Sequence, residues 1–227
     1  KPLGWAFVGL AWNSFSLAFL AAIVAVTLAI ILSYAKRSKP IKPVRTAIAM
    51  AGFGYALPGT IIAIGVLIPL AWMDHGLIAL FESAGWDSPG LLLSGSLVAL
   101  LFAYTVRFLA VALGSVQSGL EKIKPSLDHA GRSMGHSPLA ILRKIHVPLM
   151  RSSILTAVLI VFVDVLKELP ATLILRPFNF NTMAVRVYEL ASDERLADAA
   201  PAAIMIVLVG LIPVLMLHAS IARRRPR

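Results

Sequence analysis

The sequence predicts an all-α polytopic membrane protein, and three observations point to that class. Of its 227 residues, 59% are hydrophobic and 14% are charged, whereas soluble domains average about 45–50% and about 25%. Several apolar stretches reach the roughly 20 residues that a helix needs to cross a bilayer core. Most of the Lys and Arg residues lie between these stretches. We therefore expect one transmembrane domain over residues 1–227.

Five stretches are predicted to span the membrane. The first, 10–34, contains no charged residue. The second is interrupted by Pro58-Gly59, which we interpret as a kink packed against neighbouring helices, with a role in gating as the alternative. The other four predicted spans are 47–73, 91–113, 149–169 and 201–221.

The basic residues predict the orientation of these spans. Cytoplasmic loops of membrane proteins carry an excess of Lys and Arg. This bias places the N-terminus outside and the C-terminus in the cytoplasm. The residues concerned are Lys36, Arg37, Lys39, Lys42, Arg45, Lys122, Lys124, Arg132, Arg143, Lys144, Arg151, Arg223, Arg224, Arg225 and Arg227. The orientation of the spans in a lipid bilayer thus explains the net charge of +10, and no nucleic-acid partner is expected.

The segment 126–148 is the one long polar stretch between predicted spans. Pro125 and Ser126 are expected to start a helix with Asp128 in its first turn, where a negative charge suits the helix dipole. Gly135 supplies a stop or a left-handed corner. Ser137-Pro138 starts a second helix, and Val147-Pro148 is expected to end it. The prediction is two short helices joined at a glycine.

This segment resembles the cytoplasmic EAA loop of ABC importer permeases. Ala130, Gly135, Ile145 and Pro148 fall at the intervals of that loop, although His129 stands where the family has Glu, next to Asp128. The resemblance implies the type I ABC importer permease fold, a location in the bacterial cytoplasmic (inner) membrane, and a coupling loop that binds an ATP-binding subunit. The implied coupling residues are Asp128, His129, Ala130, Gly131, Gly135, Ser137, Pro138, Ile145 and Pro148.

A second resemblance concerns the last third of the chain. The stretches 167–172, 176–180 and 187–194 are similar to the C-terminal half of ferric-iron transport permeases. That similarity implies one half of a two-half permease, with a second half, two ATP-binding subunits and a periplasmic substrate-binding protein as partners. ATP and Mg would belong to the partner subunit, with no cofactor in this chain. Permeases for thiamine, polyamines, phosphonates or sulfate remain alternatives.

Charged residues in the spans and external loops give further candidate sites. Asp164, Lys167 and Glu168 share a helix face, either as a local ion pair or, with Pro170, Pro58 and Gly59, lining a translocation path. Arg107 is expected to lie too near the inner side to pair with Asp164. The segments 74–90 and 172–198 are expected to receive the binding protein. Docking candidates are Arg176, Arg186, Tyr188, Glu189, Asp193 and Glu194.

Other chemistry has weaker support. Tyr188 and its acidic neighbours could ligate ferric iron, but a solvated docking face is favoured and any metal site stays unknown. The loop histidines His129, His136 and His146 are expected at the surface. The sequence has no catalytic motif, so no catalytic residue is expected, and an intramembrane enzyme or a passive channel is the competing class. Because it begins at Lys1, the chain is expected to be part of a longer protein.

Overall fold

The structure, a computed structural model, describes residues 5–222, and its regular elements in that range are all helices. Lys1 and the basic residues Arg223, Arg224, Arg225 and Arg227 lie outside the described residues. The elements are α1 (Trp5–Ser38), α2 (Lys42–Phe53), a 3₁₀ turn (Gly54–Ala56), α3 (Gly59–Ser83), α4 (Leu97–Glu121), α5 (Pro125–Ser133), α6 (Pro138–Ile141), a π-helical turn (Leu142–His146), α7 (Val147–Leu149), α8 (Arg151–Leu166), α9 (Pro170–Leu175), α10 (Met183–Ser192) and α11 (Leu196–Ala222).

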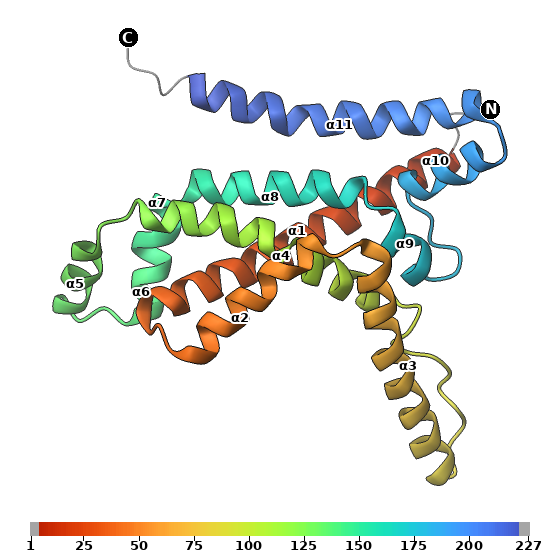
Figure 1. The fold of residues 1–227 in the computed structure, drawn as a ribbon, viewed down its shortest axis with the longest axis horizontal. Helices are drawn as coiled ribbons and strands as arrows, with labels where there is room; N and C mark the ends of the chain where they lie inside the picture. Colours follow the sequence, from red (N-terminus) through yellow and green to blue (C-terminus); the bar gives the residue numbers. More distant parts are fainter. Residues whose placement is uncertain (1–4, 223–227) are drawn as a thin grey trace.

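The core is formed where α1, α4 and α8 pack against one another. Along α1, small residues repeat every three or four positions and are fully buried, namely Ala18, Ala22, Ala25 and Ala29. On α4, a Cβ at Gly119 would come within 2.6 Å of the Ser153 side chain on α8. Such small residues let helix backbones approach closely, which drives helix packing in lipid. The three helices therefore form a tight bundle, and α11 lies along α8 (Figure 1).

The helices have the length and composition of membrane spans. Within the described residues, three helices qualify singly, at Phe7–Ser38, Gly59–Ser83 and Leu97–Glu121, and a bent pair, Pro138–Leu149 with Arg151–Leu166, would make a fourth. The all-α polytopic prediction is confirmed. The predicted fifth span falls on α11, of which Leu196–Ile212 is a shorter apolar helix.

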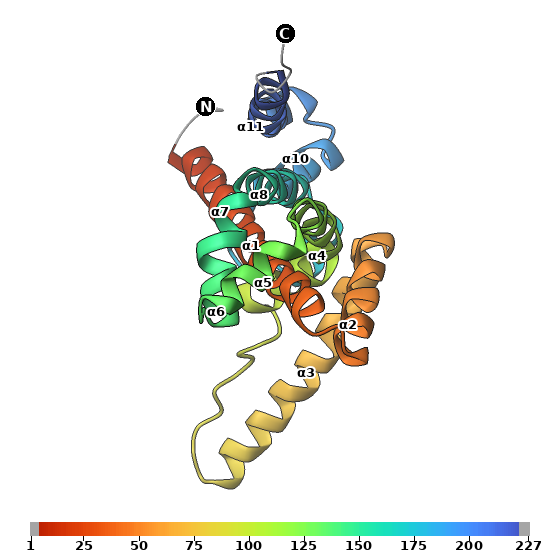
Figure 2. The ribbon, with the colours of Figure 1, turned by 90° about the vertical axis from the view of Figure 1, so that its left-hand side faces the viewer.

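The second predicted span is divided into two helices. The expected break at Pro58-Gly59 is present, but α2 and α3 are separate, and α3 projects away from the bundle (Figures 1 and 2). Leu57 is extended, with ψ 139°, as a residue before proline prefers. Gly54 also brings the chain against α4, since a Cβ there would meet the Val106 carbonyl oxygen at 2.0 Å. The chain therefore turns sharply instead of kinking.

The segment 74–90, predicted as an external loop, is largely helical. The helix α3 continues to Ser83, and Asp74 within it is buried. Its carboxylate accepts hydrogen bonds from the backbone N–H groups of Leu92, Leu93 and Ser94, at 3.1, 2.9 and 2.7 Å. Asp74 is therefore a structural anchor for the chain that returns to α4.

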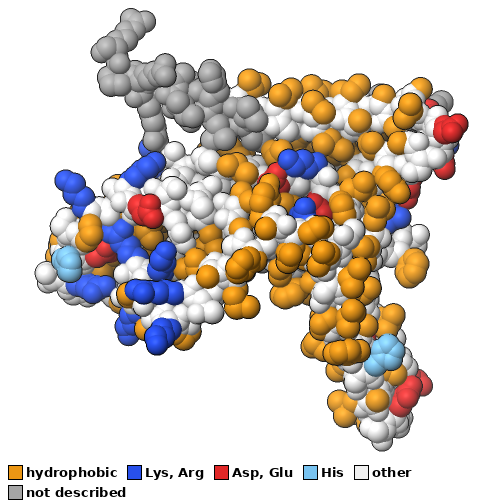
Figure 3. All heavy atoms as spheres, in the orientation of Figure 1, with side chains coloured by type: hydrophobic (Ala, Val, Ile, Leu, Met, Phe, Trp, Pro, Cys, Tyr) orange, Lys and Arg blue, Asp and Glu red, His pale blue; other side chains and the backbone are white. Residues whose placement is uncertain are grey.

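The ends of the remaining spans also differ from the prediction. The helix α4 begins at Leu97, where Ser96 accepts a hydrogen bond from the Ala99 N–H, and it runs on to Glu121. The helix α8 ends at Leu166, before the predicted end of the fourth span at residue 169, and Pro170 opens α9. In Figure 3, hydrophobic side chains cover much of α3 and of the described part of α11, and Lys and Arg gather at the end of the molecule formed by α2, α5 and α6.

Candidate functional site

The segment between α4 and α8 has the two-helix form that the sequence predicts. Pro125 occupies the first turn of α5 and Asp128 follows in the same turn. Gly135 has φ +78°, a left-handed conformation that favours glycine. Ser137 then caps α6, with its hydroxyl accepting a hydrogen bond from the Ala140 N–H at 3.3 Å. Local turn chemistry therefore sets the corner.

The second helix of this segment does not end at Val147-Pro148 as expected. A π-helical turn at Leu142–His146 leads into α7, and the chain then bends by 77° into α8. A proline has no N–H and its ring clashes with the carbonyl four residues earlier in an α-helix. In the wider turn the Val147 N–H bonds to the Leu142 carbonyl instead. The widened turn therefore carries the helix past Pro148.

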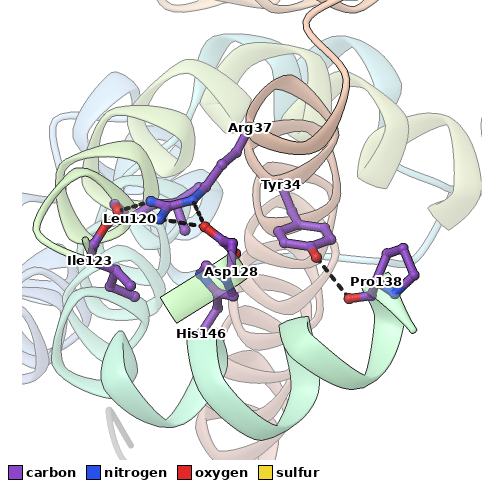
Figure 4. Close-up of polar contacts among 7 residues, drawn as sticks. All are labelled: Tyr34, Arg37, Leu120, Ile123, Asp128, Pro138 and His146. Atoms are coloured by element: carbon purple, nitrogen blue, oxygen red, sulfur yellow. Dashed lines mark hydrogen bonds and ion pairs between the residues drawn. The ribbon is translucent and has the colours of Figure 1, made fainter. Parts of the chain in front are cut away.

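One carboxylate ties this segment to the spans. Asp128 Oδ2 accepts hydrogen bonds from Arg37 Nε at 2.8 Å and forms an ion pair with Arg37 Nη2 at 2.7 Å, while Asp128 Oδ1 lies 2.6 Å from His146 Nε2. Arg37 also donates to the carbonyls of Leu120, at 2.7 Å, and Ile123, at 2.8 Å (Figure 4). We call Arg37, Asp128 and His146 the Asp128 latch. It joins the last turn of α1 to the end of α4, to α5 and to the π-helical turn.

The latch is well shielded from water. Burial raises the pKa of Asp128, whereas the hydrogen bonds from Arg37 and His146 lower it. The effects of these two partners together outweigh the burial, so the pKa of Asp128 lies below its usual value. Asp128 is therefore a carboxylate at neutral pH, and because it can only accept, His146 Nε2 is the donor. The surface position predicted for His146 is wrong, since its side chain is fully buried. The Tyr34 ring packs edge-on against it at 5.3 Å, and the Tyr34 hydroxyl donates to the Pro138 carbonyl at 2.8 Å.

The implied coupling residues divide between the inside and the outside of the segment. Asp128 and Gly131 are buried and Ile145 is half-buried, and a Cβ at Gly131 would come within 3.0 Å of Ile141. The other six, His129, Ala130, Gly135, Ser137, Pro138 and Pro148, are exposed. Exposed apolar side chains accompany them, namely Leu127, Met134, Leu139 and Leu149. A groove of about 450 Å³ follows α6, lined by Ser137, Leu139, Ala140, Arg143 and Lys144.

A second group of charges lies among the spans, where α3, α4 and α9 meet. Arg107 Nε is 3.3 Å from Glu168 Oε2, and Arg107 Nη1 donates to the Leu57 carbonyl at 3.0 Å. A Cβ at Gly59 would lie 2.5 Å from Glu168 Oε1. At the C-terminal end of α8, Lys167 Nζ is 2.9 Å from Asp164 Oδ1, which confirms that a local ion pair forms. The Arg107 and Glu168 pair was missed because the third span was placed six residues too early, which put Arg107 near its inner end.

The candidate residues near Pro170 lie where two breaks in the helices meet, the break between α8 and α9 and the break before α3. Glu168 Oε1 accepts a hydrogen bond from the Ala171 N–H at 3.2 Å, and the Thr172 hydroxyl donates to the Glu168 carbonyl at 2.6 Å. Glu168 is 7% exposed, whereas the Lys167 side chain is 63% exposed. The α8–α9 break and the break before α3 therefore share one ion pair.

The binding-protein docking candidates lie on and around α10, which ends at Ser192. Arg176 and Arg186 both approach Glu189, at 3.2 and 3.7 Å. Tyr188 is 47% exposed, and Asp193 and Glu194 follow the helix on the surface. Among the residues that the structure describes, no three His, Asp or Glu side chains are arranged to hold a metal ion.

Replacing Asp128 with Ala is expected to loosen the segment 125–149. The substitution leaves the Arg37 guanidinium and His146 without their shared acceptor, and hydrogen bonds to a charged group contribute about 1.5–3 kcal/mol each. Hydrogen exchange of peptides from 125–149 should show opening that is easier by about 2–3 kcal/mol. Asp87→Ala, which removes an exposed carboxylate, is the control and should leave the hydrogen exchange of peptides from 125–149 unchanged. Unchanged protection in Asp128→Ala would show that the latch does not hold the segment.

The Arg107 and Glu168 pair should behave as a buried unit. Breaking a buried ion pair costs about 3–5 kcal/mol because it strands one charge, whereas removing both charges is much less costly. Thermal unfolding in detergent should therefore rank Arg107→Met and Glu168→Leu each below the double variant. The exposed pair Arg195 and Asp198 serves as the control, since exposed pairs contribute about 0–1 kcal/mol. Additive effects of the two single substitutions would contradict the pairing.

Sequence comparisons relate the chain to transport permeases. No family model matches it. The Fe(3+)-transport system permease protein FbpB 2 of Haemophilus influenzae is 33% identical over 118 residues, which are 52% of this chain and 23% of that protein. A putative 2-aminoethylphosphonate transport system permease protein, PhnV of Salmonella typhimurium, is 24% identical over 220 residues, 95% of this chain and 77% of that protein. The chain thus spans about a quarter of the first relative and about three quarters of the second.

Solved structures show the same fold. A bacterial ABC transporter that imports alginate superposes with a TM-score of 0.74 at 15% identity, covering 99% of this chain and 82% of the other. The MetNI methionine ABC transporter gives a TM-score of 0.61 at 18% identity, covering 96% and 99%. Together, these findings show a multi-pass membrane protein that is similar in sequence to transport permeases and shares its fold with solved ABC transporters.

Proposed function

We propose that the chain is the permease subunit of an importer that carries its substrate into the cytoplasm and is powered by a separate ATP-binding subunit. The observation that carries the proposal is the Asp128 latch. It fixes the exposed α5–α6 corner to the ends of α1 and α4, and α7 continues directly into α8. A protein that pushes on this corner would therefore move three core helices together.

The corner has the surface chemistry of a docking site. Four apolar side chains of this segment are exposed, namely Leu127, Met134, Leu139 and Leu149, and Leu139 lines the groove together with Arg143 and Lys144. An apolar centre with charged residues at its rim is typical of protein interfaces. The occupant that we propose is a cleft of the ATP-binding subunit, with His129, Ala130, Ser137 and Pro138 at the contact.

In the proposed mechanism, nucleotide binding closes the ATP-binding subunits and draws the corner with them. Because the latch is rigid, the bundle of α1, α4 and α8 rocks as a unit between outward-open and inward-open states. ATP and Mg act on the partner subunits, and this chain contributes no catalytic residue. A second permease half and a periplasmic binding protein complete the assembly, with the exposed residues around α10 facing the binding protein.

The proposed location is the bacterial inner membrane, with the end of α1 at Ser38 and the α5–α6 corner in the cytoplasm. The gathering of Lys and Arg at that end of the molecule supports this orientation, since positive residues favour the cytoplasmic side (Figure 3). The start of α1 and the α10 region then lie on the outer side. This arrangement puts the corner where ATP is available.

The translocation path that we propose passes the Arg107 and Glu168 pair and the Asp164 and Lys167 pair. Ionisable residues inside membranes usually face the interior of the helix bundle or a water-filled cavity. When this chain is considered by itself, the Lys167 side chain is 63% exposed. Ferric iron is the proposed substrate, supported by the 33% identity to an Fe(3+)-transport permease. A phosphonate is the second candidate, supported by the longer alignment to PhnV.

Replacing Gly135 with Val should uncouple ATP hydrolysis from transport. A β-branched residue is strained at φ +78°, so the corner must rearrange, although no atom blocks the added Cβ. In the assembled complex, ATPase stimulation by the loaded binding protein should fall at least tenfold, and so should uptake. Gly135→Asn should keep much of both, because Asn tolerates left-handed φ.

The control for strain alone is Gly85→Val, where φ is +75° but the position lies outside the corner. It should leave coupling intact. Normal stimulated ATPase activity and uptake in Gly135→Val would contradict the docking role. Purification of this chain without any ATP-binding subunit, combined with conduction that needs no nucleotide, would instead favour a passive channel.

The substrate is tested by uptake into vesicles that contain the assembled complex and its binding protein. We expect ATP-dependent accumulation of radioactive ferric iron that excess 2-aminoethylphosphonate does not reduce. Elemental analysis of the isolated binding protein should show iron. Accumulation of the phosphonate without iron would reject ferric iron as the substrate and keep the permease assignment.

A further inference from the structure

A small pocket lies between the last turns of α1 and α4, beside the Asp128 latch. Its volume is about 200 Å³, and it is lined by Ser33, Lys36, Arg37, Gln117, Leu120 and Glu121. The two helices that form it are both long enough to span a membrane. The pocket therefore sits where two spans reach the membrane surface, on the basic side of the molecule.

Unpartnered polar atoms gather around this pocket. Buried polar atoms nearly always have hydrogen-bond partners. Within the described residues, five buried side-chain atoms have none, and two of them, Ser33 Oγ and Gln117 Nε2, belong to this pocket. Ser33 and Gln117 line the pocket directly, and Ser33 is only 2% exposed. A group that enters the pocket would supply the missing partners.

The lining indicates an anionic ligand. Arg37 already directs its guanidinium to Asp128 and to the Leu120 and Ile123 carbonyls. The remaining donors are the Ser33 hydroxyl, the Gln117 amide, whose Nε2 has no partner, and the exposed Lys36 ammonium, which forms no ion pair within the described residues. Glu121 is the one acidic residue of the lining, and Lys39, Lys122 and Lys124 stand close by in the sequence. Hydroxyl, amide and ammonium donors together suit phosphate oxygens.

We propose that this pocket binds the phosphate of an anionic phospholipid headgroup. The phosphates of the bilayer lie at the level where spanning helices leave the hydrocarbon, and basic pockets between such helices bind anionic headgroups. Lys36 draws the phosphate in, and Ser33 and Gln117 donate to its oxygens. Since Arg37 lines the same pocket, a bound headgroup also steadies the latch. The site requires only that α1 and α4 cross the bilayer, and it does not depend on the transported substrate.

The experiment measures lipid binding to the assembled complex in detergent. Native mass spectrometry follows a titration with phosphatidylglycerol, and a parallel titration uses phosphatidylcholine. We expect saturable binding of phosphatidylglycerol that the double variant Lys36→Ala/Gln117→Leu weakens on the order of tenfold, as losing a charge-assisted hydrogen bond and a neutral one should. Phosphatidylcholine should bind weakly to both proteins.

Two control variants test whether the effect belongs to the pocket. Lys42→Ala removes a nearby exposed cation, and Ser118→Ala removes an exposed hydroxyl that bonds to its own helix, at the Gly114 carbonyl. Both should bind phosphatidylglycerol as the unmodified complex does. Co-purification of the ATP-binding subunit with every variant checks that the complex is folded.

Two outcomes would overturn the proposal. Equal phosphatidylglycerol binding by the double variant would show that headgroups do not use this pocket. Competition by inorganic phosphate at concentrations similar to those of the lipid would show a site for soluble anions instead. Neither outcome affects the Gly135 coupling test, so failure of the lipid site and failure of the permease assignment can be told apart.

Discussion

The shared hold of Arg37 and His146 on one carboxylate, Asp128, is the interaction on which the rest of the structure depends. The corner formed by α5 and α6 has few buried residues of its own, and most of its residues are exposed to solvent. What gives it a fixed position is the latch, which reaches the end of α1 directly and the end of α4 through the carbonyls that Arg37 contacts. The corner is thereby an extension of the helix bundle.

Magnitudes show why this latch and the pair in the spans matter more than the surface ion pairs. Exposed pairs such as Arg195 and Asp198 contribute about 0–1 kcal/mol. Separating the partners of a buried pair costs about 3–5 kcal/mol, because the stranded charge has lost its water. The Arg107 and Glu168 pair and the Asp128 latch are both shielded. Each therefore constrains the helices that carry its residues.

Sequence alone could predict the features that local chemistry determines. The helix starts at Pro125 and Ser137-Pro138 and the left-handed Gly135 follow from the rules of caps and turns, and the apolar stretches follow from the thickness of the bilayer. The coupling role of the corner is an inference from the spacing of a family motif, and its test is functional.

Two of the features that sequence reasoning missed depend on partners distant along the chain. His146 is buried because α1 supplies Tyr34 and α5 supplies Asp128. Asp74 can remain inside a long helix because residues about twenty positions later satisfy its carboxylate. A single charge in an apolar stretch is a visible signal, but its partner becomes identifiable only once the helices have been placed in depth.

The central claim is that the corner and α1 move as one body, and distance measurements between spin labels test it most directly. Cysteine-linked labels at Met134 and Ile31, both exposed, report on the corner and α1. A second pair, Met134 and Leu208, reports on the corner and α11. In the assembled complex, the first distance should stay constant between the nucleotide-free and ATP-bound states while the second changes. A nucleotide-dependent change in the Met134 to Ile31 distance would contradict the rigid latch.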